Sequence, residues 1–135
     1  EDGGGSVMTE MISKWSLPMV CLPVGDSEEA TLMQDWTVFS CGWRITVPRG
    51  TKTDGASIPR ALWRLCGHPL ESPRVYAALV HDYLYGGGGP IEITRADADG
   101  VYRDLLVRLG WGSFRAWVEW CALRACGSSH WTDRK

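Results

Sequence analysis

Three separate segments of the sequence hold the side chains best suited to acid–base chemistry. The loop Thr53–Ser57 carries two hydroxyls, a carboxylate and a glycine, His81 and Asp82 are adjacent, and Asp99 follows further along the chain. A carboxylate that bonds one imidazole nitrogen fixes the tautomer and makes the other nitrogen more basic. Asp99 paired with His81 would therefore make the imidazole more basic.

The loop also has the composition of a cation site. Calcium prefers carboxylate and carbonyl oxygens, so Asp54, Gly55 and Asp82 are candidate calcium ligands. The same residue types serve as ordinary turns and helix caps, and a His-Asp pair on a helix is commonly a capped or solvated pair. A purely structural polar cluster is therefore the alternative interpretation. Arg60 and Arg95 are expected to pair with the acidic residues and hold the loops in place.

Two predicted helices must bring these side chains together. Ser72-Pro73 is a helix start, and the spacing of the apolar residues that follow predicts a helix that the run Gly86–Gly89 ends. Thr94–Asp97 resembles a capping box and begins a second helix, which Gly110 ends. Because the linker is short, the helices are expected to be antiparallel neighbours, which would place Asp99 opposite His81. The core stripe of the second helix is predicted to be Ala98, Val101, Tyr102, Leu105, Leu106 and Leu109.

The remaining elements are expected to be short strands and two further helices. Trp15–Val24 suits an edge strand because it contains two prolines. Period-two alternation over Thr37–Val47 predicts one strand, bent at Gly42, whose inward face is Phe39, Cys41, Trp43, Ile45 and Val47. Pro59 is expected to open a short helix to Leu65. A last helix is predicted over Ser113–Ala125, with an inward face of Phe114, Trp117, Val118, Cys121 and Ala125.

This order of elements predicts an α+β fold: a short N-terminal antiparallel β element followed by three to four packed helices, including an antiparallel pair. The 135 residues and the 44% hydrophobic share suit a single core. Residues 1–7 have the composition of a linker, residues 8–127 are the expected globular domain, and residues 128–135 are an expected flexible tail.

Charge and cysteine content narrow the classes of function. The net charge is −2 and no basic run occurs, which disfavours a nucleic-acid surface. The five cysteines have no C-x-x-C spacing, so a zinc site is not expected, and buried reduced thiols are favoured over disulfides. No stretch approaches the length of a transmembrane segment, and no signal peptide is seen.

The three motifs resemble an uncharacterised domain family of tailed phages and prophages. The segments are Thr53–Arg60, which includes Ser57, then His81–Tyr85, and Arg95-x-x-x-Asp99-x-x-Tyr102. The resemblance covers roughly Ile45–Leu109. It implies a phage or prophage origin and carries no settled activity.

The two helices are also similar to the active-site helix pair of phospholipase A2, especially its bacterial and fungal forms. That resemblance implies that His81 is the general base, that Asp99 orients it and that Tyr85 supports Asp99. It further implies that Asp82 binds calcium together with the loop that contains Asp54 and Gly55. The loop reads Thr-Asp-Gly-Ala-Ser here rather than Gly-rich, and disulfides expected of the enzyme family are not evident.

Two hypotheses follow. The first is a phage-encoded, phospholipase-A2-like hydrolase that acts on phospholipid or on another ester or amide, with calcium as cofactor. The second is a non-enzymatic virion, tail or host-interaction protein, in which the polar cluster is structural and some of the eight tryptophans bind phage or host proteins. Either hypothesis implies location in the virion or in the host cytoplasm.

Overall fold

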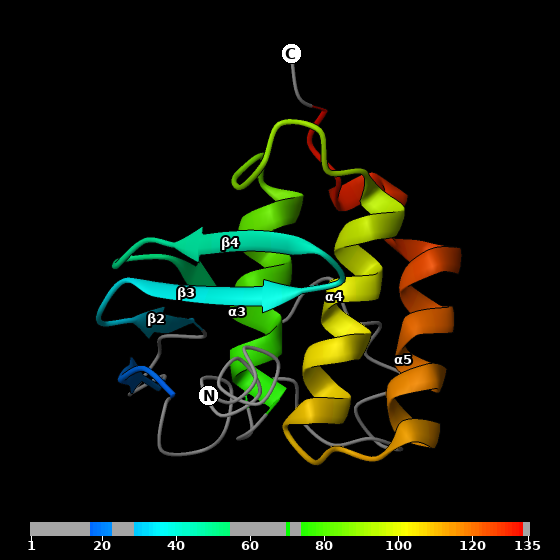
Figure 1. Cartoon of the computed structure of the whole chain (residues 1–135), viewed down its shortest axis with the longest axis horizontal. Helices are drawn as coiled ribbons and strands as arrows, with labels where there is room; N and C mark the ends of the chain where they lie inside the picture. The colour runs from blue at the N-terminus through cyan, green and yellow to red at the C-terminus, as the bar shows by residue number, and fades with distance from the viewer. Residues whose placement is uncertain (1–16, 23–28, 55–69, 71–73, 134–135) are drawn as a thin grey trace, which may run out of the picture.

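The structure is a computed structural model, and it describes residues 17–22, 29–54, 70 and 74–133. Three helices lie side by side: α3 (Arg74–Tyr85), α4 (Arg95–Arg108) and α5 (Ser113–Cys126). Helix α4 lies in the middle and packs against both of the others (Figure 1). A short 3-10 turn, η2 (Gly127–His130), follows α5.

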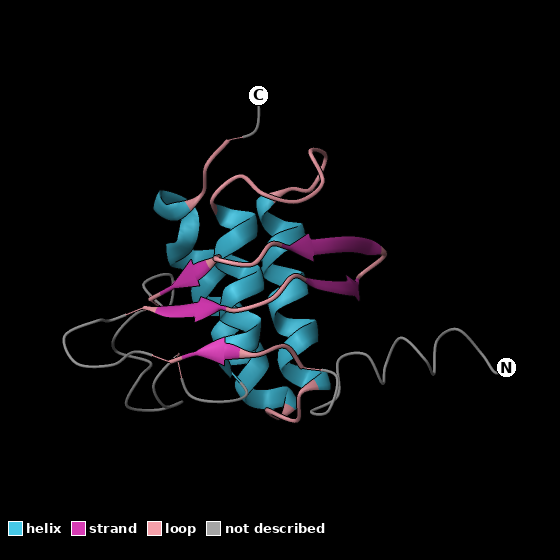
Figure 2. Cartoon of the chain, turned by 90° about the vertical axis from the view of Figure 1, so that its left-hand side faces the viewer, coloured by secondary structure: helices cyan, strands magenta, loops and turns pink. Residues whose placement is uncertain are grey.

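The strands precede the helices in the chain and form two small antiparallel sheets. Strands β1 (Val20–Cys21), β2 (Ala30–Leu32) and β5 (Lys52–Thr53) form one sheet in the order β1-β2-β5. Strands β3 (Trp36–Ser40) and β4 (Trp43–Val47) form a hairpin. The strands run across one side of the helices (Figure 2). The predicted α+β fold, with strands first and packed helices after, is confirmed.

One core joins the two layers. Hairpin residues Val38, Ile45 and Val47 are fully buried, as are residues on the inner stripes of α3 and α4 such as Leu79 and Leu105. The predicted stripe of α4 is confirmed except for Leu109, which is only partly buried. The capping box at Thr94 is also confirmed: the Thr94 hydroxyl accepts from the Asp97 amide, and the Asp97 carboxylate accepts from the Thr94 amide.

The single bent strand predicted over Thr37–Val47 is wrong. Cys41 and Gly42 form a two-residue hairpin turn in which both residues have positive φ, 54° and 81°. The turn reverses the chain, so Phe39 is half-buried and Cys41 is exposed. Alternation alone did not reveal the turn, because a cysteine is an unusual residue in the left-handed region.

The predicted inward face of α5 is also wrong. Its buried residues are Ala116, Glu119 and Leu123, whereas Phe114 and Trp117 are 73% and 45% exposed. Hydrophobic spacing misassigned the face because the helix buries a charged residue and exposes aromatic ones. The expected burial of the cysteines is wrong for the four that are described: all are free thiols, three are exposed and Cys121 is half-buried.

Several expectations fall on residues outside the described ranges, namely the linker 1–7, the two ends of the strand Trp15–Val24, the helix Pro59–Leu65 and the start at Ser72-Pro73. Val20–Cys21 does form a strand at the edge of its sheet. Within the described part of the chain, no helix combines the length and the apolar composition that crossing a bilayer requires.

Candidate active site

Helices α3 and α4 bring His81 and Asp99 into direct contact. The Nε2 atom of His81 lies 2.9 Å from Oδ1 of Asp99, and the two side chains are 1% and 0% exposed. An ionised carboxylate only accepts hydrogen bonds, so Nε2 carries the proton and donates it. The pairing that the sequence predicted from the antiparallel helices is therefore present.

Asp99 accepts hydrogen bonds from side chains on two other helices, α3 and α5. The hydroxyl of Tyr85 on α3 donates to Oδ1 at 2.6 Å, and Nη1 of Arg124 on α5 donates to Oδ2 at 2.8 Å. Burial raises the pKa of Asp99, but the bonds from His81, Tyr85 and Arg124 outweigh burial, and the net pKa lies below its ordinary value of 3.8. Asp99 is thus a fixed negative charge at neutral pH.

Asp82 lies on the other side of the imidazole. Its Oδ1 is 3.8 Å from Nδ1 of His81, and its Oδ2 accepts a short hydrogen bond from the hydroxyl of Thr53 on β5. The Asp82 side chain is 19% exposed. It is therefore more exposed than the His81 and Asp99 side chains.

The environment favours the charged form of His81. Burial lowers the pKa of His81, but the carboxylates of Asp82 and Asp99 outweigh it, and the net pKa lies above the ordinary value of 6.5. The ring packs against those of Tyr85 and Tyr102, at centroid distances of 4.0 and 5.1 Å. These contacts restrict the orientation of the imidazole.

Arg95 forms the predicted ion pair with an acidic residue, Asp99, but its hydrogen bonds go elsewhere. Its Nη1 is 3.7 Å from Asp99, beyond hydrogen-bond distance. Its guanidinium instead donates to the carbonyls of Leu123 and Arg124, at 3.0 and 3.2 Å. Arg95 thereby caps the last turn of α5 and fixes the backbone that carries Arg124.

Tyr85 is also fixed from the C-terminal turn. The amide of Thr132 donates to the Tyr85 carbonyl at 2.8 Å, and Trp131 packs edge-on against the Tyr85 ring at 5.3 Å. A Cβ added to Gly127 would lie 2.7 Å from the Tyr85 hydroxyl, so a side chain there would clash. Residues 127–132 therefore help to hold the tyrosine that bonds Asp99.

A second buried network, which the sequence analysis did not predict, lies beside the first. Glu119 on α5 accepts from Nε of Arg74 at 2.9 Å, from the Tyr102 hydroxyl at 2.7 Å and from the Trp111 indole at 2.8 Å. Arg74 and Glu119 are both 0% exposed. Burial, followed by the charge of Glu119, raises the pKa of Tyr102. Tyr102 thus connects the two networks, since its ring contacts His81.

Only some of the expected calcium ligands lie among the residues that the structure describes. Asp54 and Asp82 are described, whereas Gly55, Ser57 and Arg60 lie outside the described residues. Among the residues that the structure places, no group of three or more His, Cys, Asp or Glu side chains could hold a metal ion. Calcium also takes backbone carbonyl oxygens as ligands, and calcium binding at Asp54, Gly55 and Asp82 stays a prediction.

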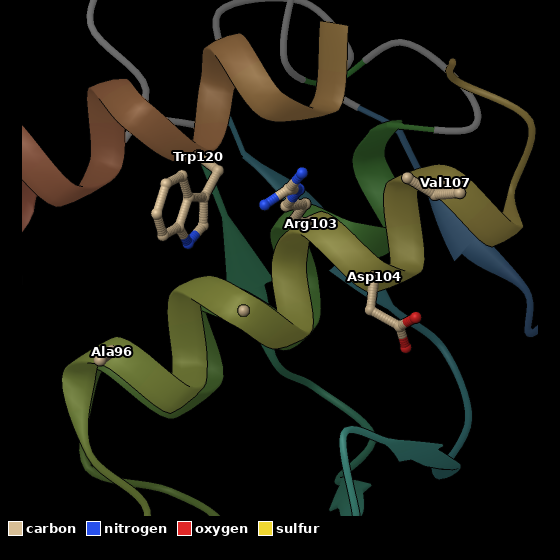
Figure 3. Close-up of a pocket in the computed structure, with 6 residues that line it drawn as sticks. Ala96, Arg103, Asp104, Val107 and Trp120 are labelled. Carbon is tan, nitrogen blue, oxygen red and sulfur yellow. The ribbon is translucent and has the colours of Figure 1, made fainter. Parts of the chain in front are cut away.

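A shallow depression of about 480 Å³ lies elsewhere, on the outer face of α4 (Figure 3). It is lined by Ala96, Gly100, Arg103, Asp104, Val107 and Trp120. The Arg103 guanidinium lies over the Trp120 ring at 5.4 Å, and Asp104 is paired with Arg108. None of the predicted site residues lines this depression.

The fold and the site together define a small α+β domain in which two helices present a buried His-Asp pair. The chain belongs to the family described as "Protein of unknown function (DUF1353)", whose model matches residues 30–123. The match includes His81, Asp82 and Asp99. The resemblance to an uncharacterised domain family is thereby confirmed at this coarse level.

Two curated relatives come from Sinorhizobium fredii. The chain is 45% identical over 43 residues to "Uncharacterized protein y4jT" and 37% identical over 71 residues to "Uncharacterized protein y4iH". These matches cover 32% and 50% of this chain, but only 13% and 28% of the two relatives. No solved structure matches.

Proposed function

We propose that the protein is a hydrolase in which His81 is the general base and Asp99 orients it. The observation that carries the proposal is the 2.9 Å bond from His81 Nε2 to Asp99, because it directs Nδ1 away from Asp99 and toward Asp82. At 3.8 Å, Nδ1 and Asp82 are too far apart for a direct bond. A water molecule on this side is the proposed nucleophile.

The proposed reaction is hydrolysis of an ester or amide. Nδ1 takes a proton from water while the water oxygen attacks the carbonyl carbon, and the imidazolium then returns the proton to the leaving oxygen or nitrogen. Asp99 stabilises the imidazolium and holds its orientation, as a buried carboxylate does beside a catalytic histidine. Phospholipid is the substrate class that the helix-pair resemblance favours, and a phage or prophage origin would place the target in a host envelope.

We expect His81→Gln to lower hydrolysis by about a hundredfold or more, since general-base catalysis contributes on this order. The measurement is fatty-acid release from phosphatidylglycerol vesicles and p-nitrophenol release from a p-nitrophenyl ester, with and without calcium. His130→Gln is the matched control because His130 is exposed on η2. Full activity in folded His81→Gln, or no hydrolysis of either substrate by the wild type, would refute the proposal.

A second candidate, a non-enzymatic interaction protein, is favoured by two observations. His81 is only 1% exposed, and Phe114 and Trp117 form an exposed aromatic pair on α5, with ring centroids 6.1 Å apart. In this case the His81 network stabilises the three-helix arrangement, and the aromatic pair contacts a phage or host protein. A catalytically silent wild type that loses stability in His81→Gln would favour this candidate.

A further inference from the structure

Asp99 is also bonded from α5, a helix that takes no part in the pairing of α3 with α4. The bond goes to the Asp99 oxygen that does not contact His81. Nη1 of Arg124, on α5, donates to Oδ2 at 2.8 Å, whereas Oδ1 receives His81 Nε2 and the Tyr85 hydroxyl. The terminal torsion of an aspartate is broad and roughly two-fold, so a carboxylate held by one oxygen can rotate. Bonds to both oxygens fix the plane of the carboxylate.

Arg124 is itself held in position. Arg95 donates to the carbonyls of Leu123 and Arg124, and its Nη1 is 3.4 Å from the Tyr85 hydroxyl. The Arg95 guanidinium therefore connects the end of α5 to Tyr85, which bonds the other oxygen of Asp99. Because Arg124 is 33% exposed, replacing it opens no large cavity in the core.

We propose that Arg124 is a positioning residue for His81, acting through Asp99. By holding Oδ2, it keeps Oδ1 aligned with Nε2, and this alignment keeps the proton on Nε2 and the lone pair of Nδ1 on the Asp82 side. The inference depends on the proposed function, because a fixed tautomer matters for a general base. Arg124 contacts neither the attacking water nor the reacting carbonyl in this scheme.

The test is the tautomer of His81 in the full chain, read from long-range ¹H–¹⁵N correlations of ¹⁵N-histidine at a pH where the ring is neutral. His81→Gln identifies the signal among the three histidines. The wild type is expected to carry the proton on Nε2. Arg124→Gln is expected to show a mixture of tautomers, and Arg124→Lys is expected to restore the wild-type pattern. The matched control is Arg108→Gln, which removes another partly exposed arginine whose partner is Asp104.

The kinetic readout is a split between kcat and KM. Arg124→Gln is expected to lower kcat by about ten- to a hundredfold, as a misplaced catalytic group does, while KM changes by less than about twofold because substrate contacts are intact. An unchanged tautomer in folded Arg124→Gln overturns the inference. If that variant does not fold, Arg124→Met takes its place, since it keeps the apolar stem and removes the guanidinium, and an unchanged tautomer there overturns the inference equally.

The two proposals fail in different ways. A wild type without hydrolytic activity, whose His81 tautomer still depends on Arg124, would refute the hydrolase and leave the positioning role intact. A wild type whose hydrolysis depends on His81, but whose tautomer and kcat are unaffected in Arg124→Gln, would refute the positioning role alone.

Discussion

At the scale of single residues, opposite charges around His81 make the stability of the fold depend on pH. A histidine whose pKa is raised in the folded state contributes stability that is fully present below its unfolded pKa and is lost as pH rises through its folded pKa. For His81 that contribution is present below about pH 6.5 and declines above it. The lowered pKa of Asp99 affects stability at acidic pH. The stability that Asp99 contributes is present above about pH 3.8 and is lost as the pH falls further.

We therefore expect the difference in melting temperature between wild type and His81→Gln to be largest near pH 6 and to shrink toward pH 9. Thermal unfolding followed by circular dichroism across this range measures the difference. His130→Gln, which replaces an exposed histidine, is the matched control. A difference that grows with pH would mean that the folded protein prefers a neutral His81, contrary to the flanking carboxylates.

The residues of the site differed in how far the sequence could predict them. His81 and Asp99 could be paired because each lies on a strongly periodic helix and the linker between the helices is short. Arg124 could not be added, since it lies 25 positions from Asp99 and no spacing rule connects the two. Arg124 could have been found only by asking which arginine of the last helix lies near the buried carboxylate of Asp99. That question cannot be answered until the packing of α5 is known.

At the scale of elements, the packing of α5 depends on a buried charge. Glu119 accepts from Arg74 and Tyr102 with Oε1 and from Trp111 with Oε2, which connects the start of α3, the middle of α4 and the loop before α5. Hydrophobic periodicity predicted the helix itself but assigned it the wrong face. A glutamate is normally solvent-facing, and only its three donors make its burial tolerable.

Glu119→Gln is expected to lower the free energy of unfolding by about 3–5 kcal/mol, because it leaves the guanidinium of Arg74 buried without its counter-charge. Urea unfolding at pH 7 measures this loss. Glu92→Gln is the matched control, since Glu92 is exposed before α4, and it should change stability by less than about 0.5 kcal/mol. A loss of that small size in Glu119→Gln would show that the pair contributes little.

At the scale of the whole molecule, the sequence predicted that strands come first and helices after. The basis was the spacing of hydrophobic residues along the chain, whose period changes from two residues to about 3.6. The hairpin was missed because its turn is Cys41-Gly42 rather than Asn-Gly or Asp-Gly, the pairs that usually mark such turns. The division into two sheets was also beyond the sequence, since β1, β2 and β5 supply only two or three residues each. Strands this short carry almost no periodic signal.

The predicted calcium site would be a property of the whole molecule, because ligands from the segment after β5 would have to meet Asp82 on α3. We expect millimolar calcium to raise the melting temperature of the wild type, by the mass-action stabilisation that any ligand specific for the folded state provides. Asp82→Asn should abolish the rise, whereas Asp104→Asn should retain it, because Asp104 pairs with Arg108 on the outer face of α4. Equal responses of wild type and Asp82→Asn would exclude Asp82 as a ligand.

The junction between the C-terminal turn and helix α3 has a mechanical consequence. The backbone of Thr132 is bonded directly to that of Tyr85, and Trp131 lies against the same ring. A load applied beyond residue 133, through surface immobilisation or a large fused protein, would reach the end of α3 through this bond as well as the end of α5 along the chain. Because the Tyr85 hydroxyl donates to Asp99, we expect such a load to act on the His-Asp pair.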